Sequence, residues 1–305
     1  MSILVIGGTG MVGGHVVHGL LKKGEAVRVL TRSADHADVL PLGASGIIGD
    51  LRKLETLRWA MKGIDCVCLI TPLSPTETEE GLAAVAAAKR AGVRHLVFLS
   101  AHGVERAPHI PHFKSKIEIQ QALRNSGMAF TLIMANTLFQ NDLLYRESIL
   151  EEGIYPEPIG DIGLNRVDAR DVADAVVATL TQTGHESQYY PLIGIEALTG
   201  QAMADIYSRS LGREIRYGGN DLEIWGEKAA RTLPGWFVPG LKLMYEFVQR
   251  HGLRASDEDF TVQAKVLGHL PRCFHAFVEE TTAAWERDGP REHAKGEGRN
   301  LMRCV

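Results

Sequence analysis

Hydrophobic residues in the first half of the chain gather in short runs separated by longer amphipathic stretches. These stretches, near 11–23, 53–62, 77–91 and 112–126, are predicted as helices because several of them end at a glycine. The hydrophobic runs contain few polar positions, which is typical of strands buried on both faces of a parallel sheet. They lie at Ile3–Ile6, Ala26–Leu30, Gly46–Ile48, Asp65–Ile70, His95–Leu99 and Ala129–Met134. The alternation predicts βαβ crossovers and a doubly wound α/β sheet.

This rhythm changes in the second half of the chain. Gly153–Gly163 is rich in glycine and proline and is predicted as a loop, whereas 197–285 is predicted to be mostly helical. Between them, a helix at Asp171–Thr181 and a strand at Tyr189–Ile193 are expected to rejoin the first sheet. We therefore expect three parts, which are a Rossmann domain over 1–155, a smaller, mainly helical domain over 156–288 with 171–193 returning to the first, and a flexible tail over 289–305.

Composition narrows the possible partners of the 305-residue chain. A net charge of −4 gives no electrostatic reason to expect binding to nucleic acid or to an anionic membrane. No apolar run approaches the roughly 20 residues that span a bilayer. The chain starts with the strand-like Ser2–Ile6 and has no basic region before it, so we expect no signal peptide and a cytoplasmic location. The cysteines and histidines lack zinc-ligand spacing, and we expect no metal.

A glycine-rich segment follows the first predicted strand and opens the first predicted helix. It reads Gly7-Gly8-Thr9-Gly10-Met11-Val12-Gly13-Gly14 and contains the spacing GxGxxG. Glycine at position 10 lets the backbone approach a pyrophosphate, and glycine at position 13 lets the helix pack close to the strand. The helix N-terminus offers unpaired N–H groups to phosphates. We therefore predict a dinucleotide site with cofactor contacts from Gly7, Thr9, Gly10, Met11, Val12 and Gly13.

The end of the second predicted strand indicates which dinucleotide binds. An NAD site usually carries an acidic residue there, but this chain has Thr31-Arg32. A guanidinium can hold a 2′-phosphate through paired hydrogen bonds. The predicted cofactor is therefore NADP(H), with Arg32 at the 2′-phosphate and Thr31 as a further cofactor contact; the alternative for Arg32 is an ordinary surface arginine in a loop. Further contacts are expected from the ends of the next strands, at Asp50, Leu51, Thr71 and Pro72; the alternative for Asp50 is that it caps the following helix.

Several segments resemble the NmrA-like group of atypical short-chain dehydrogenases. They are the glycine-rich start, Thr31-Arg32, Gly49-Asp50-Leu51, His112-Phe113-Lys114-Ser115-Lys116, Val167–Ala173, Tyr189–Gly194 and Pro271–Phe274. The resemblance covers about residues 1–285. It implies a Rossmann domain, a small C-terminal domain and a cleft between them over the nicotinamide. Members of this group are either NADPH-dependent reductases of quinones, dyes and related aromatics, or dinucleotide sensors without turnover.

The candidate catalytic residues are His112 and Lys116. Ordinary short-chain dehydrogenases place Tyr-x-x-x-Lys on one helix, and the same register here has His112-x-x-x-Lys116. Residues four apart share a helical face. Lys116 is our candidate for contact with the nicotinamide ribose, and His112 for proton donation. The alternatives are an ordinary surface lysine and a histidine without a catalytic role.

The remaining candidates follow the fifth and sixth predicted strands or lie in the helical part. Met134-Ala135 stands where the family often has Arg-Pro, so the shape of the pocket beside it stays open. Ser100 and Asn136 are expected at the cofactor. The residues expected at the substrate are His102, Phe139, Tyr145 and Trp225. A structural role is the alternative for His102, and core packing is the alternative for the tryptophan.

The leading interpretation is an NADPH-dependent reductase of a small aromatic or quinonoid acceptor. The alternative is a sensor of NADP(H) that acts on a protein partner without turnover. A hydride acceptor such as a quinone needs little acid assistance, because the anion formed is already delocalised. The protein is expected to be a monomer or a homodimer.

The choice of cofactor is testable at Arg32. Replacing it in Arg32→Ala should weaken NADPH binding tenfold to a hundredfold, because a charge-assisted hydrogen bond contributes about 1.5–3 kcal/mol. Binding of NADH should hardly change. Calorimetry with both cofactors checks this, and an equal loss for NADPH and NADH would show that Arg32 does not contact the 2′-phosphate.

Overall fold

A computed structural model describes residues 1–33 and 40–288. These residues pack as two compact units. The chain leaves the first unit at Asn136 and returns to it at Ala169 and again at Thr261. The first unit holds Met1–Ala135, Ala169–Leu192 and Thr261–His269, and the second holds Asn136–Asp168, Ile193–Phe260 and the described residues from Leu270 onward.

The first unit is built on a parallel sheet of seven strands in the described part of the chain. The strands are β1 (Ser2–Ile6), β2 (Ala26–Thr31), β3 (Ala44–Ile48), β4 (Cys66–Leu69), β5 (His95–Ala101), β6 (Ala129–Ala135) and β8 (Gln188–Leu192). Their order is β3-β2-β1-β4-β5-β6-β8, and every neighbouring pair is parallel. The winding direction reverses between β1 and β4. Ligands of such sheets bind at the carboxyl ends of the strands beside this reversal.

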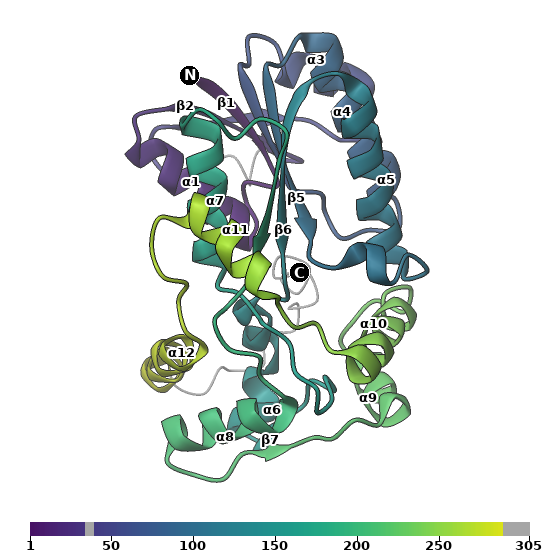
Figure 1. Cartoon of the computed structure of the whole chain (residues 1–305), viewed down its shortest axis with the longest axis vertical. Coiled ribbons are helices and arrows are strands. Elements are labelled where there is room, and N and C mark those ends of the chain that lie inside the picture. The colour runs from purple at the N-terminus through teal and green to yellow at the C-terminus, as the bar shows by residue number, and fades with distance from the viewer. Residues whose placement is uncertain (34–39, 289–305) are drawn as a thin grey trace. The chain divides into compact units, whose positions relative to one another are not determined.

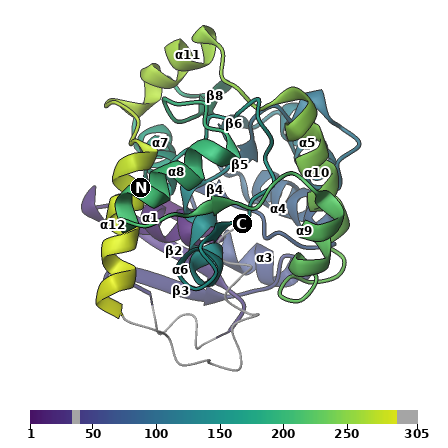
Figure 2. The ribbon, with the colours of Figure 1, turned by 90° about the horizontal axis from the view of Figure 1, so that it is seen from below.

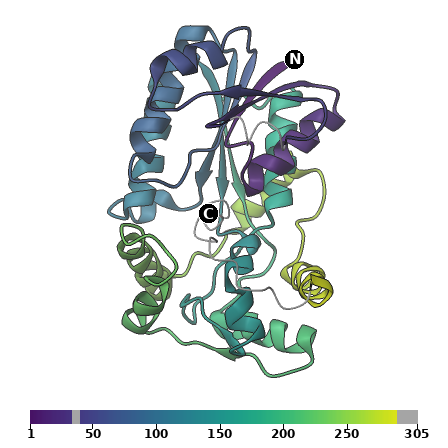
Figure 3. The ribbon, with the colours of Figure 1, turned by 180° about the vertical axis from the view of Figure 1, so that it is seen from behind.

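Helices cover both faces of this sheet. Figure 1 shows α3, α4 and α5 on one face and α1 and α7 on the other, and Figure 3 shows the same layers from behind. The helices are α1 (Met11–Lys22), α3 (Leu54–Ala60), α4 (Glu77–Ala91), α5 (Pro111–Ser126) and α7 (Ala169–Thr181), with a 3-10 turn η1 (Val104–Arg106) before α5. The central strands β1, β4, β5 and β6 are mostly buried between these layers, which explains their unbroken hydrophobic runs, whereas the edge strand β3 is largely exposed.

The elements predicted for the first unit are confirmed. Each predicted strand lies at an observed one, and the helix and strand expected to return to the sheet are α7 and β8. The glycines predicted at helix ends also agree. Gly92 and Gly127 follow α4 and α5 with φ of 72° and 74°, a conformation that glycine adopts without strain.

The second unit is mainly helical, as expected. Its helices are α6 (Arg146–Leu150), α8 (Gly200–Leu211), α9 (Leu222–Ala229), α10 (Val238–His251) and α12 (Phe274–Asp288), preceded by a 3-10 segment η2 (Phe139–Tyr145). A short parallel pair of strands joins β7 (Ile154–Tyr155) to β9 (Arg216–Tyr217). Helices α9 and α10 lie side by side (Figure 2). Helix α11 (Asp257–Leu267) is shared, because its residues from Thr261 onward belong to the first unit.

An ionic cluster lies in the core of the second unit. The Arg166 guanidinium is fully buried, 2.7 Å from a carboxylate oxygen of Asp142 and 3.4 Å from one of Glu157. The hydroxyls of Tyr155 and Tyr207 donate to Asp142 at 3.3 and 3.1 Å. Burial and the nearby Glu157 raise the pKa of Asp142 to about 6, although Arg166 opposes this. Two carboxylates thus share one cation in a dry interior.

The two units divide the chain differently from the domain ranges expected from its sequence. Residues 136–155, expected in the first domain, pack in the second unit. The expected ranges 1–155 for a cofactor-binding domain and 156–288 for a smaller domain stay a prediction. The tail over 289–305 lies outside the described residues. Among the helices of the described residues, none has the length and apolar character needed to cross a membrane.

Candidate functional site

The glycine-rich loop joins β1 to α1 in a conformation that leaves no room for a side chain at Gly7 or Gly13. Gly7 has φ of 82°, and a Cβ there would lie 2.7 Å from the carbonyl oxygen of Ile70. A Cβ on Gly13 would lie 2.0 Å from the carbonyl oxygen of Gly7. Gly10 is the N-cap of α1 and caps it with no side chain, and the first turn holds no acidic residue. The helix N-terminus is therefore a site that an anion fits, as a pyrophosphate requires.

The other loop residues expected at the cofactor differ in exposure. Thr9 and Met11 are half-buried, whereas Val12 is buried in the core of the first unit. Contact between Val12 and a phosphate would therefore have to come from its backbone N–H.

The residues expected at the adenosine end lie beyond β2 and β3. Arg32 is exposed, and the buried hydroxyl of Thr31 donates to the carbonyl of Ser33 at 3.2 Å. Asp50 accepts from the backbone N–H of Arg52 at 2.9 Å and pairs with its guanidinium at 3.3 Å. These bonds lower the pKa of Asp50. Asp50 thus closes a local turn and is not the N-cap of α3, which is Lys53; Leu51 beside it is buried.

A buried carboxylate, Glu77, stands at the centre of the next group of residues. Lys116 on α5 places its Nζ 2.8 Å from Oε1 of Glu77, at the start of α4. The Thr71 hydroxyl, just after β4, donates to the same Oε1 at 2.7 Å. Nδ1 of His112, also on α5, lies 2.8 Å from Oε2 of Glu77. The group thus joins the carboxyl end of β4 to the first turns of α4 and α5.

Lys116 has an acceptor for each of its three N–H groups. They are Oε1 of Glu77 at 2.8 Å, Oγ1 of Thr71 at 2.8 Å and the carbonyl oxygen of Leu99 on β5 at 3.3 Å. The ammonium also lies 5.2 Å from the centre of the Phe98 ring. Only 6% of Lys116 is exposed, so the lysine is not an ordinary surface residue. Its contact with a nicotinamide ribose stays a prediction.

The electrostatics of the group favour a charged Glu77. Burial alone would raise its pKa, but Lys116 and His112 outweigh burial and lower the pKa to about 2. Glu77 is therefore an ionised acceptor at neutral pH.

Sequence reasoning placed His112 and Lys116 on one helical face but missed Glu77. The structure confirms the shared face, since both side chains reach the same carboxylate. Lys114 points away, is 67% exposed and pairs with Glu118. Glu77 gave no signal in the sequence, because acidic residues in the first turn of a helix are common for electrostatic reasons.

The other candidates of the first unit, beyond the loop and the adenosine end, are Pro72, Ser100 and His102. Ser100 on β5 is buried and accepts a hydrogen bond from the Gln120 amide at 2.7 Å. Pro72 follows Thr71 and is half-buried. His102 follows β5 and donates through its backbone N–H to the carbonyl of Ala135 at 2.9 Å.

The candidates of the second unit lie in its core. Phe139 packs its ring 5.2 Å from that of Phe274, and Trp225 packs 4.8 Å from Tyr245. The Tyr145 hydroxyl lies 3.5 Å from that of Tyr245, and burial raises the pKa of Tyr145 well above its usual range. These contacts agree with the core-packing alternative for Trp225, and contact with a substrate stays a prediction for all three.

Asn136 belongs to the second unit, where its side chain is hydrogen-bonded. Its amide donates to the carbonyl of Leu253 at 3.0 Å and accepts from the backbone N–H of Thr137 at 2.8 Å. Its expected contact with the cofactor stays a prediction.

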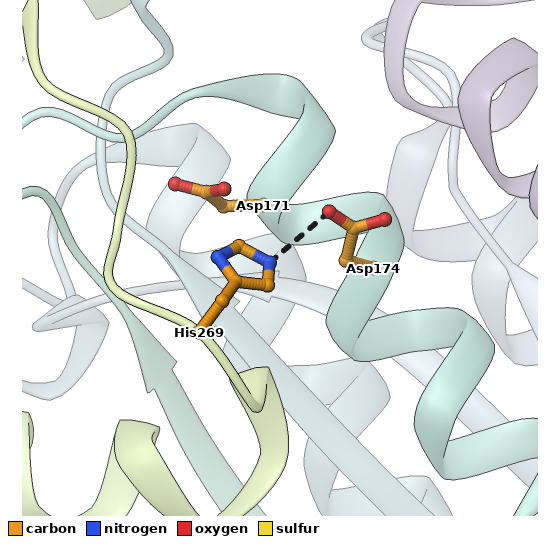
Figure 4. Close-up of side chains that lie close together, drawn as sticks. All are labelled: Asp171, Asp174 and His269. Atoms are coloured by element: carbon orange, nitrogen blue, oxygen red, sulfur yellow. Dashed lines mark hydrogen bonds and ion pairs between the residues drawn. The ribbon is translucent and has the colours of Figure 1, made fainter.

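A separate group of potential metal ligands lies on α7. Figure 4 shows Asp171 and Asp174 on this helix and His269 facing them. Their ligand atoms lie within 4.8 Å of one another. Asp171 is in the first turn of α7, where the helix dipole favours negative charge, and His269 lies 3.3 Å from Asp174. These contacts explain the three residues without an ion, and we assign no metal to them.

Acid should weaken the fold through Glu77. Its folded-state pKa of about 2 lies below the ordinary value of 4.5, so its contribution is complete above pH 4.5 and is lost as the pH falls towards 2. The advantage of the wild type over Glu77→Gln in free energy of unfolding should shrink by about 1.4 kcal/mol between about pH 6 and pH 3.5. Urea denaturation at both values measures it, and an unchanged difference would contradict the assignment.

Comparison with known proteins shows that this chain is similar to reductases. The chain is 38% identical over 242 residues to an NAD(P)H azoreductase from Xenophilus azovorans, covering 78% of this chain and 82% of that protein. It is 39% identical over 232 residues to a (4-alkanoyl-5-oxo-2,5-dihydrofuran-3-yl)methyl phosphate reductase from Streptomyces griseus, covering 75% and 79%.

A solved structure and a family model agree with the fold. The NADPH-dependent quinone oxidoreductase from Escherichia coli, solved in complex with NADPH, is 23% identical and superposes with a TM-score of 0.84. The match covers 92% of this chain and 99% of that one. The model of the NmrA-like family matches residues 1–271. The chain therefore belongs to the NmrA-like family.

Proposed function

We propose that this protein is an NADPH-dependent reductase that transfers hydride to a small aromatic or quinonoid acceptor. The observation that carries the proposal is a contact within the first unit. Gly7 of the glycine-rich loop packs against Ile70. Thr71 follows Ile70 and donates a hydrogen bond to Glu77, so it belongs to the group formed by Thr71, Glu77, His112 and Lys116 (the Glu77 group). The glycine-rich loop, our candidate for the dinucleotide, and the Glu77 group, whose His112 can donate a proton, thus lie at the same edge of the sheet. A sensor needs the first of these but not the second.

NADPH fits the loop and, when bound, supplies a hydride from its dihydronicotinamide ring. The open N-terminus of α1 holds the pyrophosphate, and the glycines keep side chains out of its place. Arg32 is exposed at the end of β2, where it can hold the 2′-phosphate. Lys116 can reach a ribose only by releasing one of its three acceptors. We therefore assign to it chiefly the placement of Glu77 and Thr71.

The chemistry named by the two relatives narrows the acceptor. An azo bond and the conjugated ring double bond of an acyl dihydrofuranone both take hydride at one atom and delocalise the negative charge that forms. A quinone does the same. We therefore propose a flat, conjugated and electron-poor acceptor, with His112 supplying the proton that completes reduction.

The proposal also covers the setting in which the protein works. We propose a cytoplasmic monomer or homodimer, whose partner is its small-molecule substrate. The sensor alternative is distinguished by turnover, as described below.

Dinucleotide binding should depend on Gly10. In Gly10→Val the added side chain fills the place of the pyrophosphate, so calorimetry should detect no NADPH binding by a protein that still folds. Gly14→Val is the matched control, because a Cβ there meets nothing within 4 Å. Equal NADPH affinity in the wild type and a folded Gly10→Val would show that the loop assignment is wrong.

Turnover should depend on His112. The wild type should consume NADPH with azo, quinone or dihydrofuranone acceptors, and His112→Ala should lower turnover by about 10²–10⁴-fold where protonation limits the rate. A quinone limited by hydride transfer should show a smaller loss. NADPH affinity should stay unchanged, and the exposed Lys114→Ala should behave as the wild type. Tight NADPH binding without turnover on any acceptor would favour the sensor.

A further inference from the structure

The two oxygens of Glu77 serve different partners. Oε1 accepts from Thr71 and Lys116, which are both buried. Oε2 is bonded to Nδ1 of His112, whose side chain remains 30% exposed. In the described residues, His112 makes no hydrogen bond through Nε2. Oε1 is therefore bonded only to buried groups, while Oε2 is bonded to an imidazole that reaches solvent.

The chemistry of this contact determines where the imidazole proton lies. An ionised carboxylate only accepts hydrogen bonds. Nδ1 of His112 must therefore carry a hydrogen and donate it to Oε2 as long as Glu77 is ionised. A neutral His112 is then left with an unprotonated Nε2, and Nε2 is the nitrogen that gains and loses the exchangeable proton.

We propose that Glu77 is a positioning residue of the reductase site, which holds His112 through Nδ1–H so that Nε2 delivers the proton to the reduced acceptor. This inference rests on the proposed reductase function. A carboxylate behind a histidine fixes both the tautomer and the orientation of the ring, as in other acid–base pairs.

The proton balance of the step is simple. Hydride addition reduces the acceptor by two electrons and oxidises NADPH, and an electron pair moves to the acceptor's partner atom. The Nε2–H bond of the His112 imidazolium breaks, a new bond to that atom forms, and neutral His112 keeps its hydrogen on Nδ1. Water returns the proton to Nε2 from the exposed side of the ring.

A purely structural role does not explain the contact with His112. Helices α4 and α5 are already joined by the Thr78–Ser115 hydroxyl pair at 3.0 Å and by close packing of Gly81 on Ile119. Lys116 gives Glu77 a buried cationic partner at 2.8 Å from Oε1, and His112 adds a second contact on the other oxygen. The His112 side chain is still 30% exposed, so its bond to Oε2 fixes the orientation of a ring that solvent reaches.

The tautomer of His112 tests the proposal without any substrate. Nitrogen-15 NMR of the wild type, at a pH well above the ordinary imidazole value of about 6.5, should show a protonated Nδ1 and an unprotonated Nε2. The signals are assigned by their loss in His112→Gln. In Glu77→Gln the preference for Nδ1–H should weaken or reverse. A wild-type His112 protonated on Nε2 would overturn the proposal.

A double-mutant cycle tests the link to turnover. With an acceptor that needs a proton, Glu77→Gln should lower turnover by about 10–100-fold, a larger factor than any loss of NADPH affinity caused through Thr71 and Lys116. Adding Glu77→Gln to His112→Ala should cause little further loss, because Glu77 acts through the histidine. Glu80→Gln is the matched control, since Glu80 lies one turn further on α4 and bonds to Ser74 and Thr76.

The outcomes separate this proposal from the one on which it rests. Multiplicative losses in the double variant would show a structural role for Glu77 and overturn the inference, while turnover in the wild type would still support a reductase. Should Glu77→Gln fail to fold, Glu77→Asp replaces it, with partial retention of turnover expected. A wild type that turns over no acceptor would overturn both proposals, whatever the tautomer of His112.

Discussion

The buried Glu77 carboxylate is the interaction on which the candidate site depends. A charge in the interior is costly unless donors surround it, and here Thr71, Lys116 and His112 come from two different segments to do so. Removing one partner leaves a buried charge without compensation. The stability lost in this way exceeds the net stability that the ion pair contributes. The carboxyl end of β4 and the starts of α4 and α5 are therefore held in one arrangement.

In this arrangement His112 and Lys116, four residues apart in the sequence, have different surroundings. Lys116 is enclosed and uses its three N–H groups on protein acceptors. His112 is held through one nitrogen, and its side chain remains 30% exposed. In an ordinary short-chain dehydrogenase the lysine contacts the ribose and a tyrosine gives the proton. Here the buried carboxylate binds the lysine, and we propose that it orients a histidine for the proton.

The second unit also contains buried charges that compensate one another, and there they stabilise a core. Arg166 lies between Asp142 and Glu157 in a fully buried cluster lined by tyrosines. One cation between two carboxylates leaves an excess of negative charge, and burial together with the nearby Glu157 raises the pKa of Asp142 to about 6, although Arg166 opposes this. The aromatic residues that the sequence offered for a substrate belong partly to this core, where they pack against one another.

The sequence by itself determined the parallel sheet, its helices and the glycine-rich loop. Those features depend on local patterns, namely unbroken hydrophobic runs, glycines at helix ends and glycines where a side chain would collide with Ile70 or Gly7. The tertiary structure alone decided the partner of His112 and Lys116. Glu77 lies 35 residues before His112, and an acidic residue at a helix start has a local explanation. Only the pairing of α4 with α5 across the ends of β4 and β5 brings that carboxylate to both side chains.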